Sequence, residues 1–238
     1  MCIPWKPREP VEALIHQGNL EGLLRKAGEL HGHFCPYVAL GVRAGYIALK
    51  ALGIDQNLGM EEVVAIVETN NCFSDGIQVV TGCTFANNAL IYRDLGKTAV
   101  TVAKRDGSAV RVALKAEYAD AFGSKYPEAH ALFEKIVVNR EQATQAEHEK
   151  LMRLWAESSF EQLKLPKEEV FNVKHMSIEV PPFAPMFASV RCSVCGENVM
   201  ETRAGVKDGK PICMACASAE HYVLDGAGIS IGKKGAAS

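Results

Sequence analysis

Two Cys-x-x-Cys pairs near the C-terminal end constrain the fold of that part of the chain more than any other feature. The pairs are Cys192/Cys195 and Cys213/Cys216, and seventeen residues separate them. This spacing is typical of a four-cysteine zinc ribbon or treble-clef-like site. A hairpin between the pairs would bring four thiolates around one ion and close its coordination shell. We therefore expect a structural zinc, whose binding supplies folding energy to a module too small to fold on a core alone.

A proline-rich stretch at residues 181–185 separates this module from the rest of the chain. Its sequence, Pro-Pro-Phe-Ala-Pro, is typical of a stiff, extended linker. We therefore expect two domains, a core domain over residues 1–180 and the zinc module over residues 187–238. The module is mildly basic but lacks interleaved aromatic residues that would stack on bases. We expect it to contact protein or to brace a dimer.

A second group of metal-ligand residues lies far from the first, in the motif His-Gly-His-Phe-Cys-Pro at residues 31–36. Two imidazoles and a thiol within five residues, interrupted by Gly and closed by Pro, are hard to explain by packing. Pro36 suits the first position of a helix, which makes Cys35 its N-cap. The positive end of the helix dipole lowers the pKa of a thiol there and favours the reactive thiolate. His31, His33 and Cys35 are therefore candidate functional residues.

Hydrophobic spacing predicts both helices and strands in the core domain. Apolar residues at helical spacing predict a helix from residue 36 to Gly53. A β-branched run at 62–69 predicts a buried strand that leads into a polar turn and a short helix. Asp106-Gly107 between two alternating runs predicts a β-hairpin. The remaining expected elements are helices at about 116–123, 127–137 and 140–163, and a strand at 171–180.

Composition and charge narrow the possible functions. The chain has 238 residues, of which 48% are hydrophobic and 23% charged, as is typical of a globular protein with a substantial core. The formal net charge of -2 gives no sign of a nucleic-acid-binding surface. No apolar run approaches the roughly 18 residues of a membrane span, and the first residues lack the apolar core of a signal peptide. We therefore expect a cytoplasmic protein that binds neither membranes nor nucleic acid.

Three motifs in order resemble the FmdE-like family, which takes its name from formylmethanofuran dehydrogenase. The first is the motif at 31–36 followed by Gly41, the second runs from Cys72 to Thr84, and the third is Gly-Lys-x-Ala at 96–99. The resemblance covers about residues 15–180, and many members also have a trailing four-cysteine finger. It implies an α+β core with a mixed sheet packed with helices, similar to the topology of the catalytic domain of glyceraldehyde-3-phosphate dehydrogenase.

The resemblance also implies a His/Cys cleft in the core. The matching positions are His31, His33, Cys35, Cys72, Asp75, Gln78 and Cys83. Cys72 and Cys83 bracket a short helix, so we expect both thiols to face the Cys35 loop. The expected ligands of a core metal ion, most simply zinc, are His33 and Cys72, with His31, Cys35 or Cys83 contributing. Fewer than four protein ligands would leave a position for water or substrate.

The same resemblance suggests catalytic and ligand-binding roles. Cys35 would be a thiolate ligand or nucleophile, and His31 a ligand or base. Asp75 would orient a ligand or accept a proton. Gln78 and Lys97 are the expected ligand-binding residues, with Lys97 suited to an anionic group.

Two hypotheses about function remain open. In the first, the chain is an enzyme or cofactor-handling protein associated with molybdenum or tungsten formylmethanofuran dehydrogenase metabolism. In the second, it is a non-catalytic accessory or carrier protein, expected as a homodimer, that docks onto such an enzyme through its finger. A finger-based transcription regulator is a third possibility, and the near-neutral charge argues against it.

Overall fold

The computed structural model describes residues 5–232. Within this range the chain divides into two compact units, the first ending at Pro181 and the second beginning at Pro182. None of the described helices is both long enough and apolar enough to span a bilayer.

The first unit is built on a five-stranded mixed sheet with the strand order β2-β1-β3-β4-β5. Its strands are β1 (Val63–Val67), β2 (Leu90–Tyr92), β3 (Ala99–Lys104), β4 (Ser108–Leu114) and β5 (Phe171–Ser177). β1 is parallel to β2, and the other neighbours are antiparallel. Asp106 and Gly107 make the predicted turn between β3 and β4, and Gly107 has a φ of 90°. β5 ends earlier than predicted because its partner β4 begins opposite Ser177. The expected α+β fold with a mixed sheet is confirmed.

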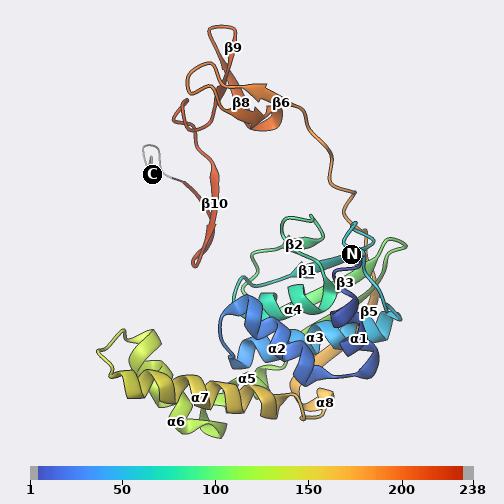
Figure 1. The fold of residues 1–238 in the computed structure, drawn as a ribbon, viewed down its shortest axis with the longest axis vertical. Coiled ribbons are helices and arrows are strands. Elements are labelled where there is room, and N and C mark those ends of the chain that lie inside the picture. The colour runs from blue at the N-terminus through green and yellow to red at the C-terminus, as the bar shows by residue number, and fades with distance from the viewer. Residues whose placement is uncertain (1–4, 233–238) are drawn as a thin grey trace. The chain divides into compact units, whose positions relative to one another are not determined.

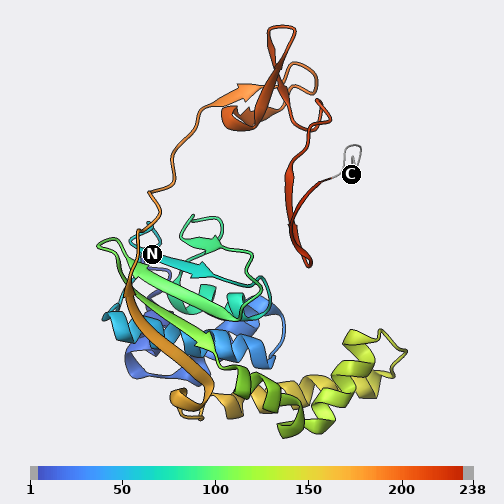
Figure 2. The same ribbon diagram turned by 180° about the vertical axis from the view of Figure 1, so that it is seen from behind.

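Four helices cover one face of this sheet (Figure 1). They are α1 (Glu9–Gln17), α2 (Leu20–His31), α3 (Pro36–Leu52) and α4 (Phe73–Thr81). Alternate residues of the central strands, such as Val100 and Val102 of β3, join α3 and α4 in one buried apolar core. Figure 2 shows the opposite face of the sheet toward the viewer, with no helix of the described range lying over it. The predicted core helix is confirmed as α3, which Gly53 ends in a left-handed conformation.

α3 and α4 approach closely because each has a glycine where they meet. A Cβ at Gly41 would lie 2.0 Å from a backbone oxygen of α4, and a Cβ at Gly76 would lie 2.4 Å from a backbone oxygen of α3. Both distances are far below van der Waals contact, so only glycine lets the two backbones approach this closely. Cys35 is the N-cap of α3 and Cys72 is the N-cap of α4. The close packing of these helices therefore brings two cysteines from distant parts of the sequence together.

An arm of helices is inserted between β4 and β5 (Figures 1 and 2). It consists of α5 (Ala116–Lys125), α6 (Pro127–Phe133) with the π-helical turn η1 (Glu134–Val138), α7 (Gln145–Gln162) and α8 (Lys167–Val170). The sequence predicts the last long helix from residue 140, but α7 begins at Gln145. Thr144 and Glu147 form a capping box there, which satisfies the free N–H groups of the first turn.

A buried arginine connects the arm to the core. Arg43 of α3 is only 4% exposed. Its guanidinium donates hydrogen bonds to the carbonyl oxygens of Gln162 (2.7 Å) and Leu165 (2.5 Å) at the end of α7. Carbonyls at a helix C-terminus lack partners within the helix, so a cation suits this position. The arm is therefore fixed to α3, the helix whose first turn bears Cys35.

The second unit consists of three antiparallel hairpins. Its elements are β6 (Ser189–Arg191), β7 (Asn198–Met200), the 3₁₀ turn η2 (Glu201–Arg203), β8 (Ala204–Lys207), β9 (Lys210–Cys213), β10 (Tyr222–Asp225) and β11 (Gly228–Ile231). In its described part, the buried hydrophobic residues are Cys192 and Ile212. So small a core cannot hold three short hairpins together without a further constraint.

Candidate metal centre

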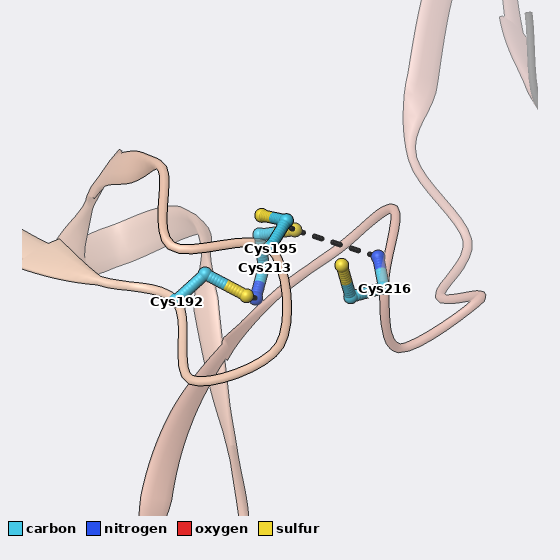
Figure 3. A group of neighbouring side chains, drawn as sticks. All are labelled: Cys192, Cys195, Cys213 and Cys216. Carbon is cyan, nitrogen blue, oxygen red and sulfur yellow. Dashed lines mark hydrogen bonds between the residues drawn. The ribbon is translucent and has the colours of Figure 1, made fainter.

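The four cysteines of the second unit converge in one group (Figure 3). Their sulfur atoms lie within 4.8 Å of one another. The backbone N–H of Cys213 donates to Cys192 Sγ, and that of Cys216 donates to Cys213 Sγ, each at 3.4 Å. The first of these bonds is the largest cause that lowers the pKa of Cys192, to about 6. Four sulfur donors supported by backbone N–H groups fit a tetrahedral Zn²⁺ that is closed to other ligands.

The second group of donors lies in the first unit, where α2 ends and α3 begins. α2 ends at His31, and Gly32 turns the chain with a φ of 87°. The ligand atoms of His31, His33 and Cys35 lie within 4.8 Å of one another. His31 Nε2 is 3.9 Å from Cys35 Sγ, and the two imidazole centroids are 4.4 Å apart. The motif found in the sequence therefore forms a compact set of two nitrogen donors and one sulfur donor.

Two residues of α4 hold His31 in place. Asp75 Oδ2 accepts a hydrogen bond from His31 Nδ1 at 2.7 Å, and Gln78 Nε2 donates to the other carboxylate oxygen at 3.0 Å. With Nδ1 bound, Nε2 is the nitrogen that faces Cys35. A carboxylate in this position raises the basicity of a ligating histidine and fixes its tautomer. The same order of groups, thiol–imidazole–carboxylate, also activates cysteine nucleophiles.

Cys72 adds a second thiol to this group. The thiols of Cys35 and Cys72 are hydrogen-bonded to each other, and this bond is the largest cause of the pKa shifts of both. It lowers the pKa of Cys72 to about 6 and raises the pKa of Cys35. The adjacent His31 lowers the pKa of Cys72 further. Burial, with a smaller contribution from His31, lowers the pKa of His33. These shifts favour the thiolate of Cys72 and the neutral imidazole of His33, which are the forms that bind metals.

We refer to His31, His33, Cys35 and Cys72, with Asp75 behind them, as the core site. The donors of His31, His33 and Cys35 form the group within 4.8 Å, and the sulfur of Cys72 lies outside that group but is hydrogen-bonded to Cys35. Such a mixed, soft to borderline set suits Zn²⁺ and related transition metals and is a poor match for Mg²⁺ or Ca²⁺, which prefer oxygen. The residues therefore fit the core ion expected from the sequence.

Cys83 does not join the core site. It follows the last residue of α4, whereas Cys72 precedes the first, and nine helical residues rise by about 14 Å. Its buried thiol donates to the carbonyl oxygen of Val63 at 3.3 Å, and burial raises its pKa to about 11. The expectation that both cysteines face Cys35 overlooked the length of this helix, and the thiol of Cys83 is packed in the core instead.

A pocket of about 460 Å³ lies beside the core site. His33, Cys35 and Cys72 form one wall. Helices α5, α6 and α7 of the arm form the other, mainly through Phe122, His130, Phe133 and Trp155. The rings of His33 and Trp155 are stacked, with centroids 5.6 Å apart and planes inclined by 24°. The core site therefore faces a space of the size used for small organic molecules.

Lys97 and Gln78 lie outside the walls of this pocket. Lys97 is exposed, and its backbone N–H donates to the carbonyl oxygen of Glu68. Arg111 is the main cause that lowers the pKa of Glu68, and the positive charge of Lys97 lowers it a little further. Gln78 contacts Asp75. A ligand-binding role for these two residues stays a prediction.

Sequence reasoning missed the contribution of the arm. Phe122, Phe133 and Trp155 lie on three different helices, and in the sequence each looks like an ordinary apolar packing residue of its own helix. His130 has no ligand-type neighbour in the sequence. Only the return of α7 to the core, held by Arg43, brings these residues opposite the core site.

Two family models match this chain, one over the first unit and one over the second. Residues 30–172 match the model of the family described as "FmdE, Molybdenum formylmethanofuran dehydrogenase operon". Residues 185–221 match the prokaryotic dksA/traR C4-type zinc finger. The second match agrees with the four-cysteine group and supports a structural zinc there.

Two individual proteins are also similar to this chain. A protein of Archaeoglobus fulgidus named "Probable S-adenosyl-L-methionine-binding protein" is 44% identical over 217 residues, which are 90% of this chain and 57% of that protein. The chain thus spans little more than half the length of this curated relative. The crystal structure of a tungsten formylmethanofuran dehydrogenase FmdE-like protein from Syntrophus aciditrophicus has a TM-score of 0.53 and 22% identity, covering 83% of this chain and 91% of that one. At that identity the likeness concerns the fold. The family match, its three ordered motifs and the shared fold together lead to one conclusion: the chain belongs to the FmdE family.

Proposed function

We propose that the core site binds a transition-metal ion, zinc in the simplest case, and that this ion acts on or holds a small molecule in the adjacent pocket. One observation supports this above all others: two members of the compact donor set, His33 and Cys35, line a pocket of about 460 Å³. A structural site is usually closed off, whereas a site for substrate needs both an ion and an empty space beside it.

The roles of the residues follow from their positions. His33 and Cys72 supply donors from the pocket wall, and His31 supplies Nε2 while Asp75 holds its other nitrogen. Cys35 is the alternative to Cys72 as the sulfur donor, because three protein ligands leave the fourth position for water or substrate. If it does not bind the ion, its thiol lies 3.9 Å from His31 Nε2, which positions the imidazole to exchange a proton with it. A bound Zn²⁺ supplies Lewis acidity and can lower the pKa of a bound water.

Metal content of the full chain tests this proposal. We expect two zinc ions per chain in the wild type and one in a His33→Ala/Cys72→Ser variant, with the finger still loaded. Cys83→Ala and His175→Ala are matched controls, because Cys83 lies at the far end of α4 and His175 is exposed on β5. Both controls should keep two ions. A wild type with a single ion would overturn the proposal, and so would an unchanged content in the His33/Cys72 variant.

The name of the Archaeoglobus relative suggests one molecule to try in the pocket. That protein is named as a probable S-adenosyl-L-methionine-binding protein, and its similarity to this chain extends over 90% of the chain. The aromatic wall of the pocket suits an adenine ring or a sulfonium group. Isothermal titration of the zinc-loaded chain with S-adenosyl-L-methionine checks this second candidate. Saturable heat that is lost in Trp155→Ala would support it, and an absence of heat would remove it.

The accessory role is an alternative to turnover by the chain itself. The family description mentions the molybdenum formylmethanofuran dehydrogenase operon, and the chain has a separate compact finger unit. In this role the chain, as a homodimer, would carry its ligand or ion to a molybdenum or tungsten enzyme. Purification from native cells separates the alternatives. A stoichiometric partner favours the accessory role, and turnover by the isolated chain favours an enzyme.

A further inference from the structure

We propose that Cys35 and Cys72 form a redox-active dithiol, which a small peroxide converts into a reversible disulfide. The disulfide itself does not depend on the proposed function, but its effect on the core ion rests on that proposal. The inference adds a covalent reaction of the chain's own residues that no relative's name and no family description gives. Three features of the structure lead to it.

The first feature is the contact between the two sulfurs. Cys35 precedes α3 and Cys72 precedes α4, and their thiols are hydrogen-bonded to each other. Gly41 and Gly76 fix the distance between these helices, since a Cβ at either position would collide with the backbone of the other helix. A disulfide requires two cysteines whose backbones already lie close together. The packing of α3 against α4 therefore places this pair within reach of a disulfide.

The second feature is the different position of Cys83, the third described cysteine of the first unit. Cys83 is fully buried, and its thiol contacts the carbonyl oxygen of Val63 and the side-chain amide of Asn57. The whole length of α4 separates it from Cys72. Among the described cysteines of the first unit, Cys35 and Cys72 are therefore the pair that can close a disulfide.

The third feature is the unequal access to the two sulfurs. Both residues line the pocket of about 460 Å³, so a small oxidant in the pocket meets this pair. Cys72 is half-buried, whereas Cys35 is only 4% exposed. The susceptibility of a thiol to oxidation rises with its exposure. We therefore assign the first reaction with the oxidant to Cys72 and the closing of the disulfide to Cys35.

The reaction has two steps, and hydrogen peroxide is the simplest oxidant. In the first step the Cys72 thiolate attacks one peroxide oxygen, the O–O bond breaks, and the released hydroxide takes up a proton and leaves as water. Cys72 is then a sulfenic acid. In the second step the Cys35 sulfur attacks the Cys72 sulfur, the S–S bond forms, the S–O bond breaks, and the hydroxide leaves as water with the proton of the Cys35 thiol. His31 Nε2, which lies 3.9 Å from Cys35 Sγ, is positioned to carry that proton.

The electrons balance over the two steps. The two thiols together lose two electrons, and these reduce one peroxide molecule to two molecules of water.

The disulfide would remove the sulfur donor of the core site, whichever of the two cysteines binds the ion. His31 and His33 would remain, and two imidazoles are fewer than the three protein ligands of a typical catalytic zinc site. A core ion bound as we propose should therefore leave when the disulfide forms. Reduction of the disulfide by an external dithiol regenerates both thiols, and the ion can then bind again.

Peptide mapping of the full, zinc-loaded chain tests the inference. The chain is treated with hydrogen peroxide, its free thiols are alkylated after unfolding, and it is digested without reduction. Cleavage at Asp75 separates Cys72 from Cys83, so mass spectrometry identifies the partner of each cysteine. We expect the Cys35–Cys72 cross-link to be the main disulfide of the first unit and to disappear with dithiothreitol. Cys83 should be recovered in its alkylated form.

Single variants test the roles of the two cysteines. In Cys35→Ser, Cys72 has no partner, so peroxide should carry it on to sulfinic acid, which dithiothreitol does not reverse. In Cys72→Ser, the buried Cys35 should stay a free thiol, and its oxidation as fast as that of Cys72 would overturn the assigned order. Cys83→Ala is the matched control and should form the cross-link as the wild type does. The mapping of the wild type stands even if a variant fails to fold.

The outcomes separate this inference from the proposed function. The metal content of each sample is measured before and after oxidation. A chain with two zinc ions that forms no Cys35–Cys72 cross-link overturns the inference and leaves the metal proposal intact. A chain with one ion that forms the cross-link supports the inference and overturns the metal proposal. A chain that forms the cross-link and keeps two ions supports the disulfide and overturns the assignment of these sulfurs as donors.

Discussion

The two cysteine-bearing sites of this chain differ in what surrounds them. The four finger cysteines come from two short turns within a unit whose described buried hydrophobic residues are Cys192 and Ile212. The core site draws its donors from the end of α2, the loop before α3 and the start of α4, and these helices pack in a large apolar core. The finger site therefore has almost no hydrophobic core around it, whereas the core site is attached to helices that a large hydrophobic core already stabilises.

This difference bears on what each ion can do. The finger ion replaces a missing core, so its coordination must be complete and closed. The core site faces a pocket, and the surrounding fold is already held by burial, so the ion that we propose there need not contribute to folding. A site that the fold does not depend on can keep a position for a ligand. We therefore expect the two sites to respond in opposite ways to loss of metal and to loss of packing.

The largest effect is expected in the finger. A Cys192→Ser/Cys213→Ser variant loses structural zinc, whose apparent binding free energy in small zinc modules is about 10–16 kcal/mol. The second unit should unfold while the first unit keeps its melting temperature. Limited proteolysis and amide chemical-shift dispersion measure this. Ser193→Ala, in the same turn, is the control and should stay folded. A second unit that resists proteolysis without zinc would contradict the claim that this unit depends on zinc for its fold.

The next effect is expected from packing in the core. In Gly76→Ala the added Cβ would lie 2.4 Å from a backbone oxygen of α3, so the helices must separate. Overpacking of this kind costs about 3 kcal/mol or more when backbone must move. The melting temperature of the first unit should fall with zinc present in excess. Gly226→Ala, which has no neighbour near the added atom, is the control. If excess zinc restored the wild-type melting temperature, the core would depend on its ion as the finger does.

A smaller effect is expected behind the core ligands. Asp75→Asn weakens the hold on His31, and loss of such an outer partner typically lowers metal affinity about 10–100-fold. The fold should be unchanged, because the side chain of Asp75 is about a third exposed. Titration against a competing chelator measures the affinity of the core site in a chain with a loaded finger. Gln78→Leu should show the same trend more weakly. Unchanged affinity in both variants would contradict a supporting role for Asp75.

The smallest effect is expected at the Glu68–Arg111 ion pair of the first unit. Arg111 lowers the pKa of Glu68, so the ionised carboxylate stabilises the folded state. This contribution is present above the ordinary glutamate pKa of about 4.3 and is lost as the pH falls through the lowered folded value. Glu68→Gln should cost about 1–2 kcal/mol at neutral pH, because Glu68 is buried while Arg111 stays partly exposed, and less in acid. Urea unfolding of the wild type and the variant at neutral and acidic pH measures this change in the free energy of unfolding. An equal change at the two pH values would contradict the prediction.

The local parts of this structure could be predicted from the sequence. The spacing of the finger cysteines predicts their convergence, Asp106-Gly107 predicts the hairpin, and Pro36 and Gly53 mark the ends of α3. Each of these depends on neighbours in the chain, so turn and capping chemistry is enough. The contact of His31 with Asp75 required the resemblance to the family, because the two residues are 44 positions apart in the sequence.

The parts that depend on long-range packing could not be predicted in this way. Cys83 looks equivalent to Cys72 in the sequence, yet the length of α4 separates them. Trp155 and His130 look like ordinary helical residues, and they reach the pocket because Arg43 holds the end of α7 against α3. A sequence pattern records which face of a helix is apolar, but not which element that face meets.

The central claim is that the core site holds an ion independently of the finger. The most direct test is the zinc content of the Cys192→Ser/Cys213→Ser chain beside that of the wild type, measured by mass spectrometry after removal of loosely bound metal. The account predicts two ions in the wild type and one in the variant, with the remaining ion lost when His33 and Cys72 are also replaced. One ion in the wild type and none in the finger variant would contradict it.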